Sequence, residues 1–348
     1  MTLEDFLEQD SEWLKGSGPS SNIVMSSRTR LARNLDKVPF SNWANKKQLD
    51  DILMSVKQAA HTSNFLKNAM FFRLKDLNEV DRLFLVERHL MSPEHAKDAE
   101  YKAVIVDAKE IVSIMINEED HLRIQVMQSG LNLRECWRII DEIDTDLSKK
   151  LPFAYSARWG YLTACPTNTG TGLRGSAMLH LPALVFTGQI GKVLQAIAKL
   201  GLNVRGLYGE GTEATGNVFQ ISNQVSMGIT EEDIIDNIER ITNQIISRED
   251  ATRKTILVKN KDELVDRVSR AYGTLKNAHI ITSSETVTLL SAIRLGVDLG
   301  IVKNLDRRMV NELFILTQPA HLQKLEKKVL NSNERDIKRA DLIREKLK

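Results

Sequence analysis

The sequence predicts an α+β fold in which strands joined by hairpins, with helices in other segments, are followed by a helical region. Two β-branched runs, residues 102–107 and 111–117, are separated by only three residues, as in an antiparallel hairpin. Helical patterns gather in other segments, which favours α+β over a doubly wound sheet. From about Thr230 onward the apolar spacing is helical, with no convincing strand. We therefore expect an α+β domain over residues 1–255 and a helical domain over residues 256–348.

Each element is predicted from its own pattern of apolar residues. Besides the hairpin, strands are expected at residues 23–25, 122–128 and 218–224, where β-branched or alternating residues occur. Apolar residues three and four apart predict helices. These helices cover residues 49–56, 133–147, 184–200, 234–245, 264–275, 284–295 and 308–316.

Composition indicates a soluble, cytoplasmic protein. The 348 residues are 42% hydrophobic and 27% charged, with a net charge of +2. We find no apolar run near the roughly 20 residues that cross a bilayer, and the acidic N-terminus does not resemble a signal peptide. Two cysteines, Cys136 and Cys165, exclude a disulfide framework. We expect neither membrane insertion nor direct binding of nucleic acid.

Two long segments contain no carboxylate. Residues 147–209 hold no Asp or Glu, where about eight would be expected from the overall composition. Residues 13–35 are also free of acids. Both segments carry several lysines and arginines, including Arg28, Arg30, Arg174 and Arg205. Segregated positive charge in a nearly neutral chain predicts a site for a polyanion, such as a polyphosphate.

Two motifs within these segments are candidates for phosphate contacts. Residues 170–175 match the G-x-G-x-x-G pattern, but no strand precedes them and no acid follows about 20 residues later, as a dinucleotide fold requires. A loop that brings Arg174 to phosphate remains open, beside a plain turn. In residues 26–30, alternation places Arg28 and Arg30 on one face. The alternative is an edge strand in water.

An acidic counterpart lies between two predicted strands. Glu118, Glu119 and Asp120 are consecutive, and such carboxylates raise each other's proton affinity unless a cation is near. The alternative is a charged turn in water. Residues 205–213 end the acid-free stretch with three glycines and Glu210, as in a backbone that loops around a ligand.

These segments resemble the motifs of the phosphagen (guanidino) kinases, and most closely their bacterial protein-arginine kinase branch. The motifs are Ser26-Ser27-Arg28-Thr29-Arg30, residues 117–123, residues 165–174, and residues 205–210. The resemblance implies a phosphagen-kinase catalytic domain, built on a large antiparallel sheet flanked by helices. It also implies that this domain transfers phosphate from ATP, with Mg²⁺, to a guanidino group. It implies catalytic roles for Glu119, Glu210, Arg123, Arg174 and Arg205. It places magnesium near Glu118 and Asp120, and Cys165 near the substrate. The implied ATP contacts are Ser26, Ser27, Arg28, Thr29, Arg30, His89, Arg123, Arg174, Gly175, Ser176, Ala177, Met178, Arg205, Gly206, Leu207, Tyr208, Gly209 and Glu210.

The position of the first motif bears on the substrate. In kinases of free guanidino compounds a helical domain precedes it and encloses the substrate, whereas here the motif begins at residue 26. The resemblance therefore implies phosphorylation of arginine on proteins. A kinase of free guanidino compounds and a non-catalytic phospho-arginine-binding adaptor remain the alternatives.

The C-terminal segment carries a further motif. Asn331 and Glu334 form a capping pattern, after which Arg335 and Arg339 lie on one helical face and Asp336 can pair with Arg339. This is also the pattern of a solvated, salt-bridged helix. In the family, the motif that ends at Ala340 implies an allosteric phospho-arginine site. The family further implies a homodimer, a zinc-binding activator protein, a part in the stress response and delivery of marked proteins to a Clp ATPase and protease.

Overall fold

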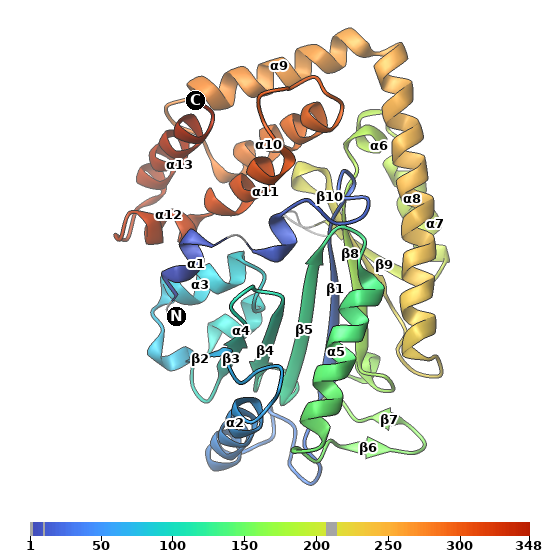
Figure 1. Ribbon diagram of the computed structural model, residues 1–348, viewed down its shortest axis with the longest axis vertical. Coiled ribbons are helices and arrows are strands. Elements are labelled where there is room, and N and C mark those ends of the chain that lie inside the picture. Colours follow the sequence, from blue (N-terminus) through green and yellow to red (C-terminus); the bar gives the residue numbers. More distant parts are fainter. Residues whose placement is uncertain (1–2, 10, 207–213) are drawn as a thin grey trace.

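An eight-stranded antiparallel sheet forms the centre of the protein (Figure 1). The computed structural model describes residues 3–9, 11–206 and 214–348. The strand order is β2-β3-β4-β5-β1-β8-β10-β9. The bounds are β1 Val24–Arg33, β2 Met70–Arg73, β3 Ala103–Val106, β4 Val112–Ile116, β5 Leu122–Ser129, β8 Leu173–His180, β9 Leu202–Gly206 and β10 Val218–Asn223. A separate ribbon pairs β6 Tyr155–Ser156 with β7 Gly160–Tyr161. The predicted α+β class and the hairpin of β3 and β4 are confirmed.

Strand β1 is longer than the strand predicted at residues 23–25, and it lies inside the sheet rather than at an edge. It spans ten residues and pairs with β5 on one side and β8 on the other. The arginine motif therefore lies inside this strand, and the alternative of an edge strand in water is wrong. Likewise, residues 173–175 of the glycine-rich motif begin strand β8 instead of continuing a loop. Neither extension was visible locally, because polar residues interrupt both patterns.

Helices cover one face of the sheet. Helix α2 (Lys46–His61), α5 (Leu133–Ser148), α7 (Ile190–Lys199) and the first part of α8 (Glu231–Lys259) share a hydrophobic core with this face. The predicted single helix over residues 184–200 is wrong, because α6 (Pro182–Phe186) ends before Gly188, whose φ is +66°. Glu249 of α8 caps α6 by accepting hydrogen bonds from the backbone N–H groups of Ala183 and Leu184, both at 3.0 Å.

The C-terminal helices form a layer beyond the end of the sheet (Figure 1). They are α9 Lys261–Asn277, α10 Ser283–Asp298, α11 Arg307–Leu316, α12 Pro319–Leu325 and α13 Ser332–Lys346. Helices α10, α11 and α13 share a second core with Met25, Met127 and Met178, which lie on the sheet face opposite α5 and α8. The capping box of Asn331 and Glu334 at α13 is present as predicted. The predicted boundary at residues 255 and 256 falls inside α8.

Short helices complete the fold at the edge nearest β2. These are α1 Asp5–Glu8, α3 Glu79–Glu87 and α4 Pro93–Lys97. Glu87, at the end of α3, accepts hydrogen bonds from the backbone N–H groups of Ala320 and His321 and so caps α12. Among the described helices, none has both the length and the apolar character needed to cross a bilayer.

Candidate active site

A cleft of about 520 Å³ opens on the part of the sheet that α5 and α8 leave uncovered. Its floor consists of polar side chains from β1, β5, β8, β9 and β10, and its walls come from residues 86–93 and Gln318. Small-molecule sites in proteins commonly have volumes of roughly 300 to 1,000 Å³. The cleft is therefore large enough for a nucleotide.

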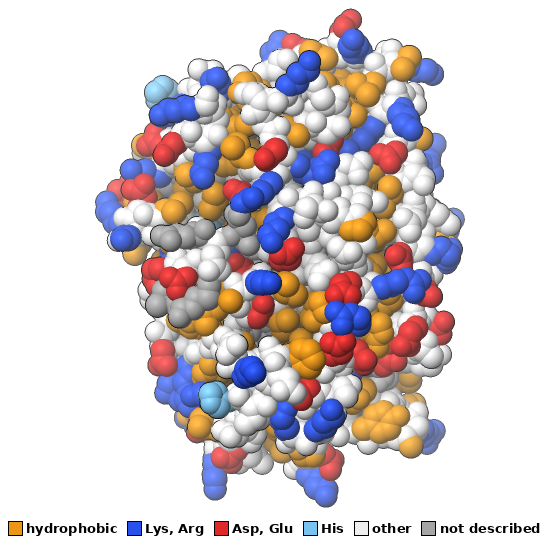
Figure 2. Space-filling view, viewed as in Figure 1, with side chains coloured by type: hydrophobic (Ala, Val, Ile, Leu, Met, Phe, Trp, Pro, Cys, Tyr) orange, Lys and Arg blue, Asp and Glu red, His pale blue; other side chains and the backbone are white. Residues whose placement is uncertain are grey.

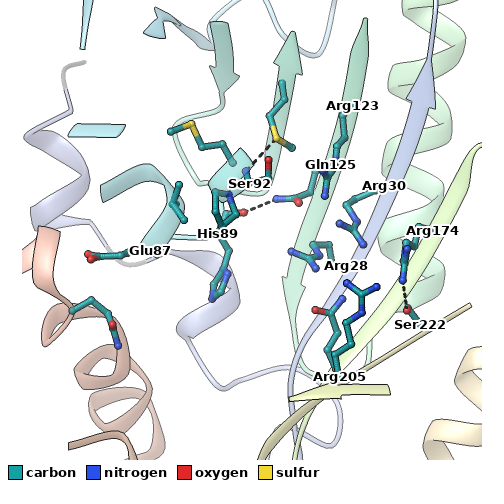
Figure 3. Close-up of a pocket in the computed structure, with 16 residues that line it drawn as sticks. Arg28, Arg30, Glu87, His89, Ser92, Arg123, Gln125, Arg174, Arg205 and Ser222 are labelled. Carbon is teal, nitrogen blue, oxygen red and sulfur yellow. Dashed lines mark hydrogen bonds between the residues drawn. The ribbon is translucent and has the colours of Figure 1, made fainter. Parts of the chain in front are cut away.

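Five arginines converge on this floor from four strands (Figure 3). Arg28 and Arg30 come from β1, Arg123 from β5, Arg174 from β8 and Arg205 from β9. Arg30 pairs in register with Arg174 on one side and with Gln125 on the other. Directly paired residues on neighbouring strands point to the same face, so the sheet forces these side chains together.

Most of this positive charge has no carboxylate beside it. Burial, followed by the charges of Arg123 and Arg174, lowers the pKa of Arg28 to about 9. The pKa of Arg30 is lowered well below its ordinary value, first by burial and then by Arg28. Within the described residues, the buried Nε atoms of Arg30 and Arg174 have no hydrogen-bond partner. Crowded cations with free donors form a site that an anion stabilises.

The other end of the cleft is less polar. Val86, Met91, Pro93 and Met115 line it together with His89. Burial, and then the charge of Arg28, lowers the pKa of His89 to about 3, so its ring is neutral at pH 7. The ring packs edge-on against Trp13, with 5.2 Å between centroids. Its buried Nε2 has no partner among the described residues, which leaves one polar atom within an apolar wall.

The acidic loop lies beside the arginines, and each of its carboxylates has different surroundings. Glu118 is held by Arg123 at 2.7 Å and also by the Ser92 hydroxyl. Asp120 is buried and accepts hydrogen bonds from the Asn34 side chain and the Ala164 N–H, both at 2.7 Å. Glu119 is exposed and interacts with Cys165, and partial burial followed by the charge of Asp120 raises its pKa. Asp120 thus fixes the loop that carries Cys165 next to Glu119.

Several predicted ATP contacts face away from the cleft. Ser27 and Thr29 bond to the backbone of Gly130 and Cys136, on the side of α5. Gly175 faces Ile238 of α8, and Ala177 lies in the core on the same side. These side chains position the strands rather than line the cleft. Ser26, Ser176 and Met178 lie on the arginine face, where Met178 joins the second core. Leu207, Tyr208, Gly209 and Glu210 lie outside the described residues, and Gly206 ends β9.

The sequence reasoning missed several neutral residues of the cleft. Gln125, Gln220 and Ser222 line it, and Ser222 accepts a hydrogen bond from Arg174 at 3.2 Å. Gln125 donates to the carbonyl of His89 at 2.7 Å. The only signal for these residues is their alternation with buried apolar residues along β5 and β10. Glu87 and Gln318 had no signal, because they reach the cleft through contacts between distant segments.

In the predicted C-terminal motif, Arg339 links α13 to the segments that contain Ile281 and Thr317. Arg339 is buried and donates to the carbonyls of Thr317 and Ile281, both at 2.8 Å, and to Asp336. Arg335 is half-buried and bonds to the Leu330 carbonyl at 2.9 Å. Ala340 is part of the second core. The predicted pairing of Asp336 with Arg339 is confirmed.

The fold and the arginine-lined cleft together define a phosphotransferase of the guanidino kinase class. A family model described as ATP:guanido phosphotransferase, C-terminal catalytic domain, matches residues 51–252. A second, described as the protein-arginine kinase McsB C-terminal domain, matches residues 261–348. The chain therefore belongs to the ATP:guanido phosphotransferase family, in its protein-arginine kinase branch.

Relatives along the whole chain agree with this assignment. A protein-arginine kinase from Halothermothrix orenii is 49% identical over 100% of this chain and 99% of its own. Another from Symbiobacterium thermophilum is 49% identical over 97% of each chain. Among solved structures, lombricine kinase is similar with a TM-score of 0.58 and 23% identity, over 70% of this chain and 72% of its own. The duplicated taurocyamine kinase from Schistosoma mansoni has a TM-score of 0.62 and 20% identity, over 87% and 52%. These two structures support the fold.

Proposed function

We propose that this kinase transfers the γ-phosphoryl group of ATP to the guanidino groups of arginine side chains in proteins. The observation that carries the proposal is the convergence of Arg28, Arg30, Arg123, Arg174 and Arg205 on a floor whose border holds Glu119 and Cys165. One side of the site thus suits a polyphosphate, and the other suits a cation.

The arginines bind the triphosphate and stabilise its charge during transfer. A γ-phosphoryl group passes through a loose transition state whose charge lies on its equatorial oxygens. Fixed guanidinium groups stabilise that charge without having to reorganise, because the strands already hold them in place. The apolar wall around His89 accommodates the adenine. Holding both reactants in line contributes a further roughly 7 to 11 kcal/mol to lowering the barrier.

The carboxylates prepare the guanidino group. A guanidinium is a poor nucleophile because it is protonated and delocalised. Glu119 orients the fork through paired N–H bonds and accepts the proton as a guanidino nitrogen attacks the γ-phosphorus. A P–N bond forms, the P–O bond to ADP breaks, and the proton remains on the carboxylate. Glu210, four residues beyond the end of β9, is proposed as the second carboxylate of this pair.

Magnesium is proposed to bind mainly through ATP and water. Within the described ranges no group of three or more His, Cys, Asp or Glu residues is arranged to hold a metal ion. Glu118 is already occupied by Arg123, and Asp120 by Asn34 and Ala164. These two carboxylates would therefore face magnesium-bound waters rather than the ion itself. When bound, magnesium neutralises phosphate charge.

The test is direct. The protein is incubated with ATP and either free arginine or an unfolded arginine-containing protein, and acid-labile phosphate is then located by phosphorus NMR and mass spectrometry. We expect phospho-arginine on the protein and little on free arginine. Efficient phosphorylation of free arginine alone would instead indicate a kinase of small guanidino compounds. Tight nucleotide binding without transfer would indicate a binding protein.

We also propose the regulatory setting that the family suggests. The chain would act in the cytoplasm as a homodimer, with a zinc-binding activator, and mark stress-damaged proteins for a Clp ATPase and protease. The catalytic part would extend to about residue 255. The half-buried Arg335, with Arg339 behind it, would bind phospho-arginine as an allosteric ligand. Free phospho-arginine should then alter turnover in the wild type and in Lys338→Ala, but not after replacement of both arginines.

A further inference from the structure

A second hollow of about 410 Å³ lies on the surface, which we call the hairpin groove. It is lined by the β6–β7 hairpin (residues 155–161), by Gly170 and Thr171, and by residues 226–233 at the start of α8. Figure 2 shows apolar side chains gathered where Figure 1 places β6 and β7. None of the roles assigned above uses this groove.

Large apolar side chains are unusually exposed along the groove. Tyr155 is 64% exposed, Trp159 45%, Met227 41% and Ile229 36%. Val225, beside them in sequence, is 56% exposed. Single exposed apolar residues are common on soluble proteins, but a contiguous group of them indicates an interaction surface for a protein, a membrane or a ligand.

The groove is rigid before any ligand arrives. The Arg33 guanidinium stacks 3.4 Å above the centre of the Tyr161 ring, and Arg33 itself forms a buried ion pair with Asp144 at 2.8 Å. Tyr161 and Gly170 exchange backbone hydrogen bonds of 2.8 and 3.2 Å. A Cβ atom on Gly160 would lie only 2.4 Å from the Gly170 carbonyl oxygen, so the two backbones touch. A preformed surface loses little entropy when it binds a flexible chain.

One loop connects the groove with the candidate active site. Ser226, in the groove, donates from its hydroxyl to the carbonyls of Thr167 and Thr169. The same loop carries Cys165, which interacts with Glu119. Gly170 is five positions after Cys165, so their Cα atoms lie within about 18 Å of each other. An extended polypeptide of five or six residues can span that distance.

The charge of the groove matches a cationic chain. Glu231 and Asp233 line it at the start of α8, and Glu232 lies between them in the same turn. The one cation in the described lining, Arg158, lies over the Trp159 ring at 4.5 Å from its centroid. A bound segment can therefore place apolar side chains on the aromatic surface and basic groups near the acids.

We propose that the hairpin groove binds the unfolded polypeptide segment that flanks the target arginine, and prefers a large apolar residue about five positions away. This proposal rests on the proposed function. Folded proteins bury most of their large apolar side chains. An enzyme that recognises an arginine together with an accessible large apolar residue therefore selects unfolded segments. Selection then comes from the surface beside the site and not from the guanidino pocket.

Two synthetic peptides test the proposal. Each is unstructured and has a single arginine, with either Trp or Ser at the position five residues away. We expect wild-type kcat/KM to be about tenfold higher for the Trp peptide. Trp159→Ala and Met227→Ser should remove that preference while leaving turnover of N-acetyl-arginine amide unchanged. The matched control is Val258→Ser, another exposed apolar position, about 40 Å along α8 from Glu231.

The outcomes separate the two proposals. If the wild type phosphorylates neither peptide nor any unfolded protein, the proposed function fails. If it phosphorylates both peptides equally, or if the Trp preference survives in both groove variants, the groove proposal is overturned. Both substituted side chains are exposed, and the melting temperature of each variant checks that it folds; should one variant misfold, the other carries the test.

Discussion

Arginine serves opposite purposes in two regions of this molecule. On the sheet, Arg28, Arg30 and Arg174 crowd together with lowered pKa values, and none of them forms an ion pair with a described carboxylate. Between α8, α10 and α11, Arg253, Arg294 and Arg307 surround Asp298, at distances of 3.3, 3.7 and 2.7 Å. Glu249 adds a second buried carboxylate, 2.8 Å from Arg253.

The paired arginines around Asp298 stabilise the fold, whereas the cleft arginines that form no ion pair with a described carboxylate suit the binding of an anionic ligand. In the Asp298 cluster (Arg253, Arg294, Arg307, Glu249 and Asp298) every charged group lies beside an opposite charge, so removal of a carboxylate leaves buried arginines with less compensation. In the cleft, removal of one arginine relieves repulsion. Partly buried charge that has no ion-pair partner is therefore a useful indicator of function, since it costs stability that packing elsewhere must offset.

The largest expected effect concerns Glu119, the carboxylate proposed to face the substrate. Glu119→Gln should lower kcat by about 10⁴-fold, because it removes the proton acceptor while keeping the shape of the side chain. ATP affinity, measured by calorimetry, should change little. A collapse of ATP affinity in this variant would place Glu119 in the phosphate half of the site.

The next effect tests the arginine floor. Arg174→Ala should lower kcat by about 10³-fold, the scale of a lost charge-stabilising arginine. Its melting temperature should stay level or rise, because a repelling charge is gone. Steady-state kinetics and thermal melts on the same preparation check both parts. Near wild-type turnover would reject the role of Arg174.

In the Asp298 cluster the opposite pattern is expected. Glu249→Ala should lower the free energy of unfolding by about 3 kcal/mol, because Arg253 loses its 2.8 Å ion pair and keeps only the longer one to Asp298, and because α6 loses its cap. The residual folded enzyme should keep its kcat. Glu239→Ala, which breaks an exposed ion pair with Arg134, is the matched control and should leave denaturant unfolding almost unchanged. Equal losses in both variants would contradict the comparison.

Anion binding should restore the stability that the crowded arginines cost. A non-hydrolysable ATP analogue at 100 times its Kd should stabilise the wild type by about 2.7 kcal/mol. Arg30→Met should melt at a higher temperature than the wild type without nucleotide and gain much less when nucleotide is added. A lower melting temperature for ligand-free Arg30→Met would show that Arg30 is structural.

The smallest effect concerns pH. The pKa of Glu119 is raised above its ordinary value of 4.5, so activity should disappear on acidification at a higher pH than for a free glutamate. The Asp120 charge contributes to that shift. Asp120→Asn keeps an oxygen for Asn34 and Ala164 but removes the charge, and should therefore move the acid limb of kcat/KM to lower pH. An unmoved limb would mean that another group controls it.

The sequence was most informative about local features of the structure. The arginine alternation of β1, the hairpin of β3 and β4, and the Asn331 cap were all predicted and are present. Contacts between distant segments were not predictable. Nothing in residues 79–87 indicates that Glu87 caps α12, and nothing in α8 indicates that Glu249 caps α6. The pairing of Glu118 with Arg123 also depends on strand register, which the motif alone does not define.

Helix α8 is a single rod shared by two hydrophobic cores. Its first half, with Ile234, Ile238 and Ile245, packs under the sheet, whereas Ile256 near its end packs among α6, α9 and α10. Unfolding of α8 in one core would also remove its contacts with the other core. Heating should therefore give one calorimetric peak for the whole chain. Cutting the backbone near residue 255 should then yield two fragments that remain associated rather than two independent domains.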